Sequence, residues 1–244
     1  VNILSDGMNA GVGNLIAENN LQHTIKVFWE LTAIRYLIVG IIIFGLLLFL
    51  QPFIACWFGS QYLLNDLILY LLIINVFIML SRGVVEMYIG AYGLFSDVWA
   101  AWTELIVNIS ITLCLAPYIG IIGILIGKII SIIFIAMLWK PYFLFCKGFC
   151  LNVSFYWRGM VPYYMVFGFF TIIVILLQQY FFVPQLNNLS TLFTIGICIY
   201  VFLIINYFVV LFLATKGMKN FVKRQPFIYN KLISLNKIFY RHVS

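Results

Sequence analysis

The stretch IGIIGILIGKIISIIFIAML, residues 119–138, decides the fold class. It carries one charged residue, Lys128, among side chains that are otherwise apolar or small. About 20 mostly apolar residues suffice to cross the hydrocarbon core of a bilayer. A lysine near the middle of such a span costs about 2.5–3.5 kcal/mol on insertion scales, so it is expected to face protein or water. The stretch therefore predicts a polytopic membrane protein with a polar interior.

The composition of the whole chain supports the same class. Of 244 residues, 65% are hydrophobic and 9% are charged, and the mean hydropathy is +1.11. Soluble domains carry about 25% charged residues, so this chain has too few to coat a water-soluble core. The net charge of +7 comes largely from basic residues at the predicted helix ends. That placement favours a membrane over nucleic acid as the partner.

Apolar windows of spanning length recur along the chain, so we expect an all-α, polytopic transmembrane helix bundle. The transmembrane domain covers 33–214. A cytoplasmic start at 1–32, formed by the end of a preceding helix and a loop, comes before it, and a basic tail at 215–244 follows. The six predicted spans are 33–53, 63–81, 99–117, 119–138, 163–182 and 192–214.

The basic residues fix the predicted orientation. The connections on one side, 1–32, 82–98, 139–162 and 215–244, contain twelve lysines and arginines, whereas those on the other side, 54–62, 117–118 and 183–191, contain none. Basic connections stay in the cytoplasm, so both ends of the chain are predicted to be cytoplasmic. The aromatic segment 140–161 is expected to lie along the membrane surface. The tail is expected to form an interfacial helix on anionic lipid.

Several polar residues fall within or beside the spans. Glu104, Asn108 and Thr112 are four apart and form one stripe on a helix. Their alternative role is hydrogen bonding between helices. The candidates for lining a cargo cavity are Lys128, Glu104, Asn108, Arg82, Glu86 and Arg35.

The charged candidates also have structural interpretations that the sequence leaves open. Arg82 and Glu86 are spaced for an intrahelical ion pair. Arg35, with Glu30 at the start of the first span, can extend to the cytoplasmic surface. Lys128 could form a buried ion pair with Glu104.

A second pattern in the fourth predicted span concerns packing. Gly123, Gly127 and Ser131 form a small-xxx-small ridge that allows close approach of another helix, and the turn at Pro117 makes the third span the expected neighbour. Lys128 follows Gly127, so it points about 100° away from this ridge. The residues predicted to serve helix packing are Gly120, Gly123, Gly127 and Ser131.

No arrangement of residues predicts covalent chemistry. The two histidines, His23 and His242, lie near opposite ends of the chain, and the five cysteines lack metal-ligand spacing. Neither a metalloprotease nor a nucleotide-binding motif is present. We therefore expect no enzyme activity, no cofactor and no metal site.

Three stretches together resemble the bacterial polysaccharide flippases of the multidrug/oligosaccharidyl-lipid/polysaccharide exporter superfamily. They are AGVGNLIAENN at 10–20, GLFSDVW at 93–99, and GIIGILIG at 120–127 followed by WKPY at 139–142. The first stretch, with Gly11, Gly13 and Asn14, is similar to a cytoplasmic loop of that superfamily. The order of the three matches the later part of such a protein, over residues 8–150.

The resemblance implies a fold, a function and partners. The chain would be the C-terminal part of a two-lobe exporter, as a truncated fragment or the product of a broken gene. That exporter would move undecaprenyl-diphosphate-linked oligosaccharide, an O-antigen or capsule unit, across the bacterial inner membrane. Implied partners are the lipid-linked oligosaccharide, membrane lipids and other polysaccharide assembly proteins, with no nucleic acid. Lys128 suits the diphosphate, and Glu104 is a candidate for ion coupling.

Two other functions remain open from the sequence. A drug or small-cation exporter of the same superfamily would favour acidic cavity residues. The cationic side chain of Lys128 argues against that function. A membrane-embedded polysaccharide polymerase or glycosyltransferase would be expected to have a sizeable outer loop with arginine. The predicted outer loops are short and contain no arginine.

Overall fold

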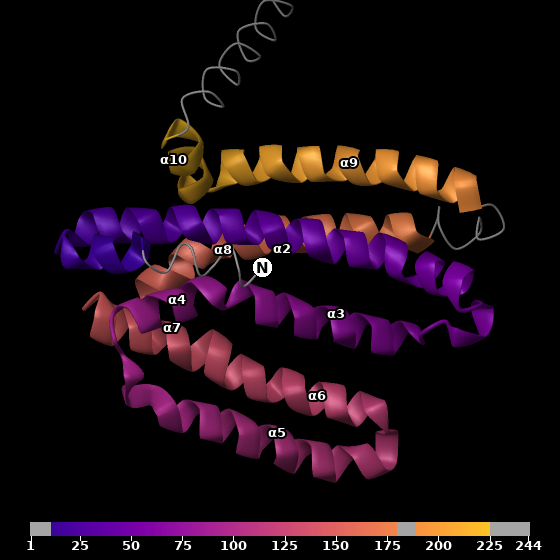
Figure 1. Cartoon of the computed structure of the whole chain (residues 1–244), viewed down its shortest axis with the longest axis horizontal. Coiled ribbons are helices and arrows are strands. Elements are labelled where there is room, and N and C mark those ends of the chain that lie inside the picture. The colour runs from indigo at the N-terminus through magenta and orange to yellow at the C-terminus, as the bar shows by residue number, and fades with distance from the viewer. Residues whose placement is uncertain (1–10, 180–188, 225–244) are drawn as a thin grey trace, which may run out of the picture.

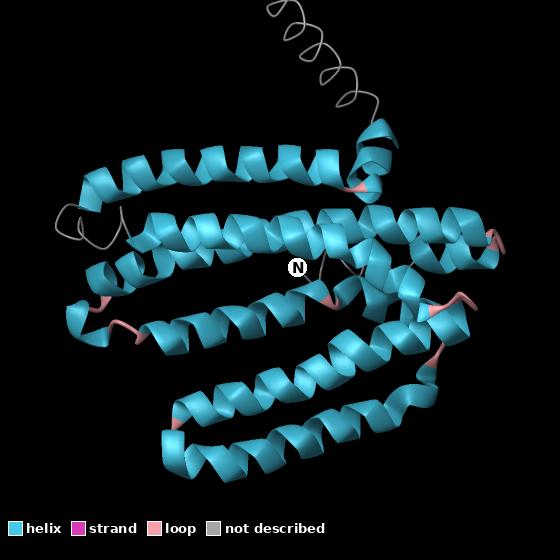
Figure 2. Ribbon diagram, turned by 180° about the vertical axis from the view of Figure 1, so that it is seen from behind, coloured by secondary structure: helices cyan, strands magenta, loops and turns pink. Residues whose placement is uncertain are grey.

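The computed structural model describes residues 11–179 and 189–224, and all regular structure within them is helical (Figures 1 and 2). Residues 11–17 form a first short helix, and single 3₁₀ turns cover Ser60–Tyr62 and Phe95–Asp97. The main helices are α2 (Leu21–Trp57), α3 (Asp66–Ser81), α4 (Gly83–Ala91), α5 (Val98–Ile119), α6 (Ile121–Ile132), α7 (Lys140–Phe143), α8 (Val153–Leu177), α9 (Leu189–Ala214) and α10 (Lys216–Arg224). Two stretches of wider π-type turns flank α7. Ile133–Trp139 joins α6 to α7, and Leu144–Gly148 follows α7.

Six helical units are long and apolar enough to cross a membrane, which confirms the predicted fold class of a multi-pass helical membrane protein. They are Leu21–Trp57, Asp66–Ala91, Phe95–Ile119, Ile121–Gly148, Val153–Leu177 and Thr194–Ala214. Each overlaps one of the windows predicted from hydropathy, although several begin two or three residues later than predicted, and the fifth begins earlier and ends before the predicted boundary.

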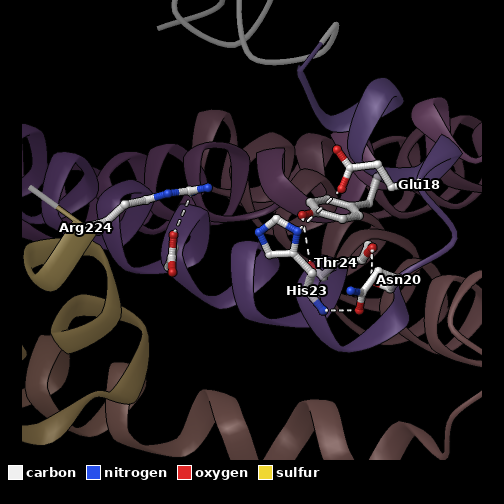
Figure 3. A network of polar contacts seen from close by, with 7 residues as sticks. Glu18, Asn20, His23, Thr24 and Arg224 are labelled. Atoms are coloured by element: carbon white, nitrogen blue, oxygen red, sulfur yellow. Dashed lines mark hydrogen bonds and ion pairs between the residues drawn. The ribbon is translucent and has the colours of Figure 1, made fainter.

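Local sequence explains where several helices begin and end. The Asn20 side chain accepts a hydrogen bond from the His23 backbone N–H at 3.1 Å and so caps α2 (Figure 3). Asn65 and Asn152 cap α3 and α8 in the same way, each at 2.9 Å. Between α5 and α6 stands Gly120 with φ of 59°. That left-handed backbone suits glycine, so the two helices form a tight hairpin there.

The helices lie side by side with α2 in the middle of the bundle (Figures 1 and 2). It contacts α3, α8, α9 and α10. The core between these helices is rich in aromatic rings. Phe44 lies 5.1 Å from Tyr207 between ring centroids, and Phe77 stacks on Phe167 at 4.4 Å. The α5–α6 hairpin forms one edge, where α6 packs on α3.

Two helices extend beyond their predicted limits. The helical unit from Ile121 continues to Gly148, so the prediction of one surface segment over 140–161 is wrong: the non-helical connection is 149–152. The reason is burial, because Phe143, Leu144 and Phe145 pack in the core. Helix α2 starts at Leu21 instead of 33. Tertiary packing of an apolar face stabilises such extensions more than helix propensity does.

The structure describes the first part of the predicted tail, up to Arg224. Helix α10 packs on α2, with Met218 and Val222 buried. Its apolar face is thus covered by protein instead of lipid. The remaining tail, 225–244, lies outside the described residues, as does most of the predicted outer connection at 183–191.

Candidate functional site

Charged side chains from three helical units meet at one end of the bundle. Arg82 stands at the junction of α3 and α4, with Glu86 one turn later on α4. Glu104 comes from α5 and Lys140 from the start of α7. These four residues, hereafter the charged cluster, are separated by up to 58 positions in sequence. The unit Ile121–Gly148 runs in the same direction as α3 and α4, so the C-terminal ends of these helical units lie together (Figure 1).

Ion pairs connect the four residues of the charged cluster. Lys140 Nζ donates to Glu86 Oε1 at 2.7 Å, and Arg82 Nε lies 3.4 Å from the same oxygen. Arg82 Nη1 is 3.8 Å from Glu104 Oε1. The side chains are 22–34% exposed. Half-buried ions of both signs therefore compensate one another where a lone charge would be costly.

A pocket of about 330 Å³ opens beside the cluster. It is lined by Arg82, Ala101, Glu104, Leu105, Asn108 and Lys140. Leu105, one of the lining residues, is 46% exposed. The pocket thus combines charged side chains with an exposed apolar one, which suits a ligand with both characters.

Arg35 approaches the cluster from α2. Its Nε donates to the Leu80 carbonyl at 2.7 Å, near the end of α3. The guanidinium lies over Gly83, where an added Cβ would collide with it. Arg35 is also close enough to interact electrostatically with Glu86. The Arg35 guanidinium therefore stabilises the backbone carbonyls at the C-terminal end of α3. Its positive charge also attracts the Glu86 carboxylate.

The predicted glycine ridge lies against α5. An added Cβ on Gly123 would lie 2.7 Å from the Leu115 backbone carbon, and one on Gly127 would lie 2.7 Å from Thr112 Oγ1. Ser131 is buried on the same side of α6. The polar stripe of α5 thus has two roles along its length. Glu104 and Asn108 line the pocket, whereas Thr112 packs on the ridge.

Lys128 lies apart from the charged cluster. It is exposed and does not line the pocket. Lys140 follows twelve positions later on the same helical unit, a distance of about 18 Å along the axis. Within residues 11–179 and 189–224 no ion pair of Lys128 is found, and Glu104 faces Arg82 instead. The structure therefore brings together Arg82, Glu86, Glu104, Asn108 and Arg35, but not Lys128.

Lys140 is the site residue that the sequence analysis missed. It was assigned to a connection because the apolar run ends at Leu138. One pattern in the sequence could have indicated its role. Lys140 comes just after the fourth predicted span, as Arg82 comes just after the second, so both lie at the same end of the bundle. Its ion pair with Glu86, however, joins residues 54 positions apart, which no local pattern reveals.

The motif of Gly11, Gly13 and Asn14 is not a loop, in contrast to the expectation from the resemblance. Residues 11–17 are helical. The two glycines have open space around them, so neither is required for a close contact. Val12 is buried in the main core, and this packing accounts for the helix.

A second buried charge lies on α2. Glu30, which the sequence placed beside Arg35, is 3% exposed and pairs with Arg224 at 3.2 Å, where α10 crosses α2 (Figure 3). The sequence analysis missed this pair, which spans 194 positions. Within the described residues, no group of three His, Cys, Asp or Glu side chains could hold a metal ion.

Comparison of the chain with protein-family models, curated proteins and solved structures gives no match. The arrangement of the site itself therefore carries the functional argument. It consists of ion pairs beside a pocket at one end of the helical bundle, and the pocket lining contains no serine, cysteine or histidine. Such an arrangement suits binding and release of a charged ligand.

Proposed function

We propose that this chain is part of a polysaccharide flippase that moves undecaprenyl-diphosphate-linked oligosaccharide across the bacterial inner membrane. The supporting observation is the pocket whose lining combines the charged cluster with the exposed apolar side chain of Leu105. A lipid-linked glycan has the matching parts: an anionic diphosphate, a polar glycan and an apolar tail. The family resemblance supplies the identity of the carrier.

In this proposal the cluster exchanges partners when cargo enters. Phosphate oxygens take the place of Glu86 and Glu104 as acceptors for Lys140 and Arg82. Ionised hydrogen bonds of this type are short and strong, and both cations can donate several of them. The two carboxylates hold the cations in position while the pocket is empty. The exchange avoids stranding a cation in a poorly hydrated place.

The balance of charge at the pocket favours this cargo over a drug or small cation. Two carboxylates face Arg82 and Lys140, and Arg35 adds a third cation behind Glu86. A site for cations would need excess negative charge. A polymerase or glycosyltransferase is less well supported, because the connections between Trp57 and Asp66 and between Ile119 and Ile121 are short.

The experiment removes one charge of the cluster in the parent protein, within cells whose surface glycan can be measured. Lys140→Ala should abolish glycan export while leaving membrane insertion intact. The matched control is Lys147→Ala, which removes an exposed lysine from the same helical unit. Surface glycan and protein abundance are measured together.

The double variant Glu86→Gln with Lys140→Gln separates a cargo contact from a structural pair. It removes both charges of the Lys140–Glu86 pair together and so strands neither of them, while Arg82 keeps Glu104 as its partner. A cargo contact predicts normal abundance without export. If the double variant exports normally, the cluster is a structural ion pair and the proposal is refuted.

A further inference from the structure

Helix α10 has two chemically different faces. Its inner face is formed by Gly217, Met218 and Val222, all buried. Gly217 lies so close to the Trp29 carbonyl on α2 that an added Cβ would collide with backbone. Arg224 closes the far end by pairing with Glu30. The helix is therefore fixed on α2 at both ends.

The outer face is basic. Lys216 and Lys223 are exposed, and Lys219 is half-buried between them. Their spacing of three and four positions places all three on one side of a helix. The segment Lys216–Arg224 contains no acidic residue. Among the residues that the structure describes, none of these three lysines, hereafter the basic stripe, forms an ion pair, so they present a positive surface.

The position of the stripe places it beside the membrane. Thr215 alone separates α9 from α10. Helix α10 turns steeply off the axis of α9 at one end of the bundle (Figures 1 and 2) and packs on α2. Lys216 is therefore at the membrane boundary, where the electrostatic attraction of anionic lipid acts on basic side chains.

We propose that the basic stripe binds the headgroups of anionic phospholipids in the adjoining leaflet. Charge complementarity selects this occupant. The apolar face of α10 is already occupied by α2, so the helix does not insert into acyl chains as a membrane-surface helix would. Binding is instead electrostatic, specific for negative headgroups and sensitive to salt. This surface is separate from the charged cluster and its cargo pocket.

The test uses the full chain purified in a neutral detergent. Phosphatidylglycerol or phosphatidylcholine is added, and bound lipid is measured by native mass spectrometry alongside the melting temperature. Each lysine near an anionic surface contributes about 1 kcal/mol. Replacing three, in Lys216→Gln/Lys219→Gln/Lys223→Gln, should therefore weaken phosphatidylglycerol binding by about 100-fold and remove the associated rise in melting temperature.

Two further variants serve as controls. Lys26→Gln/Lys147→Gln/Arg158→Gln removes three exposed cations elsewhere and should retain selective binding. Lys216→Arg/Lys219→Arg/Lys223→Arg preserves the charge and should also retain it. The proposal is overturned if the glutamine variant of the stripe still binds phosphatidylglycerol as wild type does, if the first control loses as much, or if inorganic phosphate stabilises the protein equally well.

Discussion

At the scale of single residues, Lys128 and Lys140 show that the neighbouring helices decide whether a lysine forms an ion pair. Both belong to the unit Ile121–Gly148. Lys128 follows the turn at Gly120 by eight positions, about 12 Å along the axis, and is exposed. Its flexible stem can carry the ammonium group towards the end of the bundle at which Gly120 lies. Lys140 instead meets Glu86 at 2.7 Å. The position of a lysine within an apolar run is thus a poor guide to its partners.

Glu30 and Arg224 allow a direct test of a buried charge. Arg224→Ala should destabilise the protein by about 1–3 kcal/mol, because it leaves the buried Glu30 carboxylate without its charged partner. The arginine side chain is 56% exposed, so part of its charge is screened and a larger loss is not expected. Thermal unfolding in detergent measures the change.

The double variant Glu30→Gln with Arg224→Ala is the informative control for this pair. A neutral amide at position 30 removes the stranded charge, so the double variant should be more stable than Arg224→Ala alone. A non-additive cycle of this kind isolates the coupling between neighbouring residues. Equal stability of the single and double variants would mean that the ion pair does not hold α10 on α2.

At the scale of helices, the α5–α6 hairpin depends on glycine. Gly123→Ala should destabilise the protein by about 1–3 kcal/mol, the usual cost of overpacking, because the new Cβ meets the backbone of Leu115 at 2.7 Å. Gly168→Ala on α8 is the matched control, since nothing lies within 4 Å of its Cβ position. Thermal unfolding of both variants gives the comparison. Similar melting temperatures would show that close approach at the ridge is unnecessary.

The sequence predicted helices better than it predicted their ends and partners. Hydropathy located all six spans, and helical spacing placed Gly123 and Gly127 on one ridge. Hydropathy did not show that α2 begins at Leu21 or that helix continues through Lys140, because aromatic burial between distant segments stabilises those turns. Likewise Glu104 and Asn108 followed from spacing, whereas Lys140 and the Glu30–Arg224 pair required the packed fold.

At the scale of the whole molecule, the bundle has two chemically distinct ends. Lys26, Lys147 and Arg158 lie at the end that also carries the charged cluster and α10. The opposite end carries exposed aromatic side chains without lysine or arginine among its described connections; they are Trp57, Tyr62 and Tyr118. Aromatic residues favour the membrane–water interface, and basic residues favour the cytoplasmic side. Because aromatic belts form at both interfaces, the distribution of basic residues alone predicts the orientation, with the basic end in the cytoplasm.

That orientation gives a prediction about labelling in intact cells. In a cysteine-free background, Ser60→Cys should react with a membrane-impermeant maleimide added outside, because Ser60 is exposed between α2 and α3 at the end without basic residues. Ser154→Cys, exposed at the start of α8, should react only after the cells are lysed. Both sites are exposed in the protein, so a difference in labelling reports the side of the membrane. Labelling of Ser154→Cys in intact cells, with protection of Ser60→Cys, would reverse the orientation and place the charged cluster and the basic stripe on the outer side.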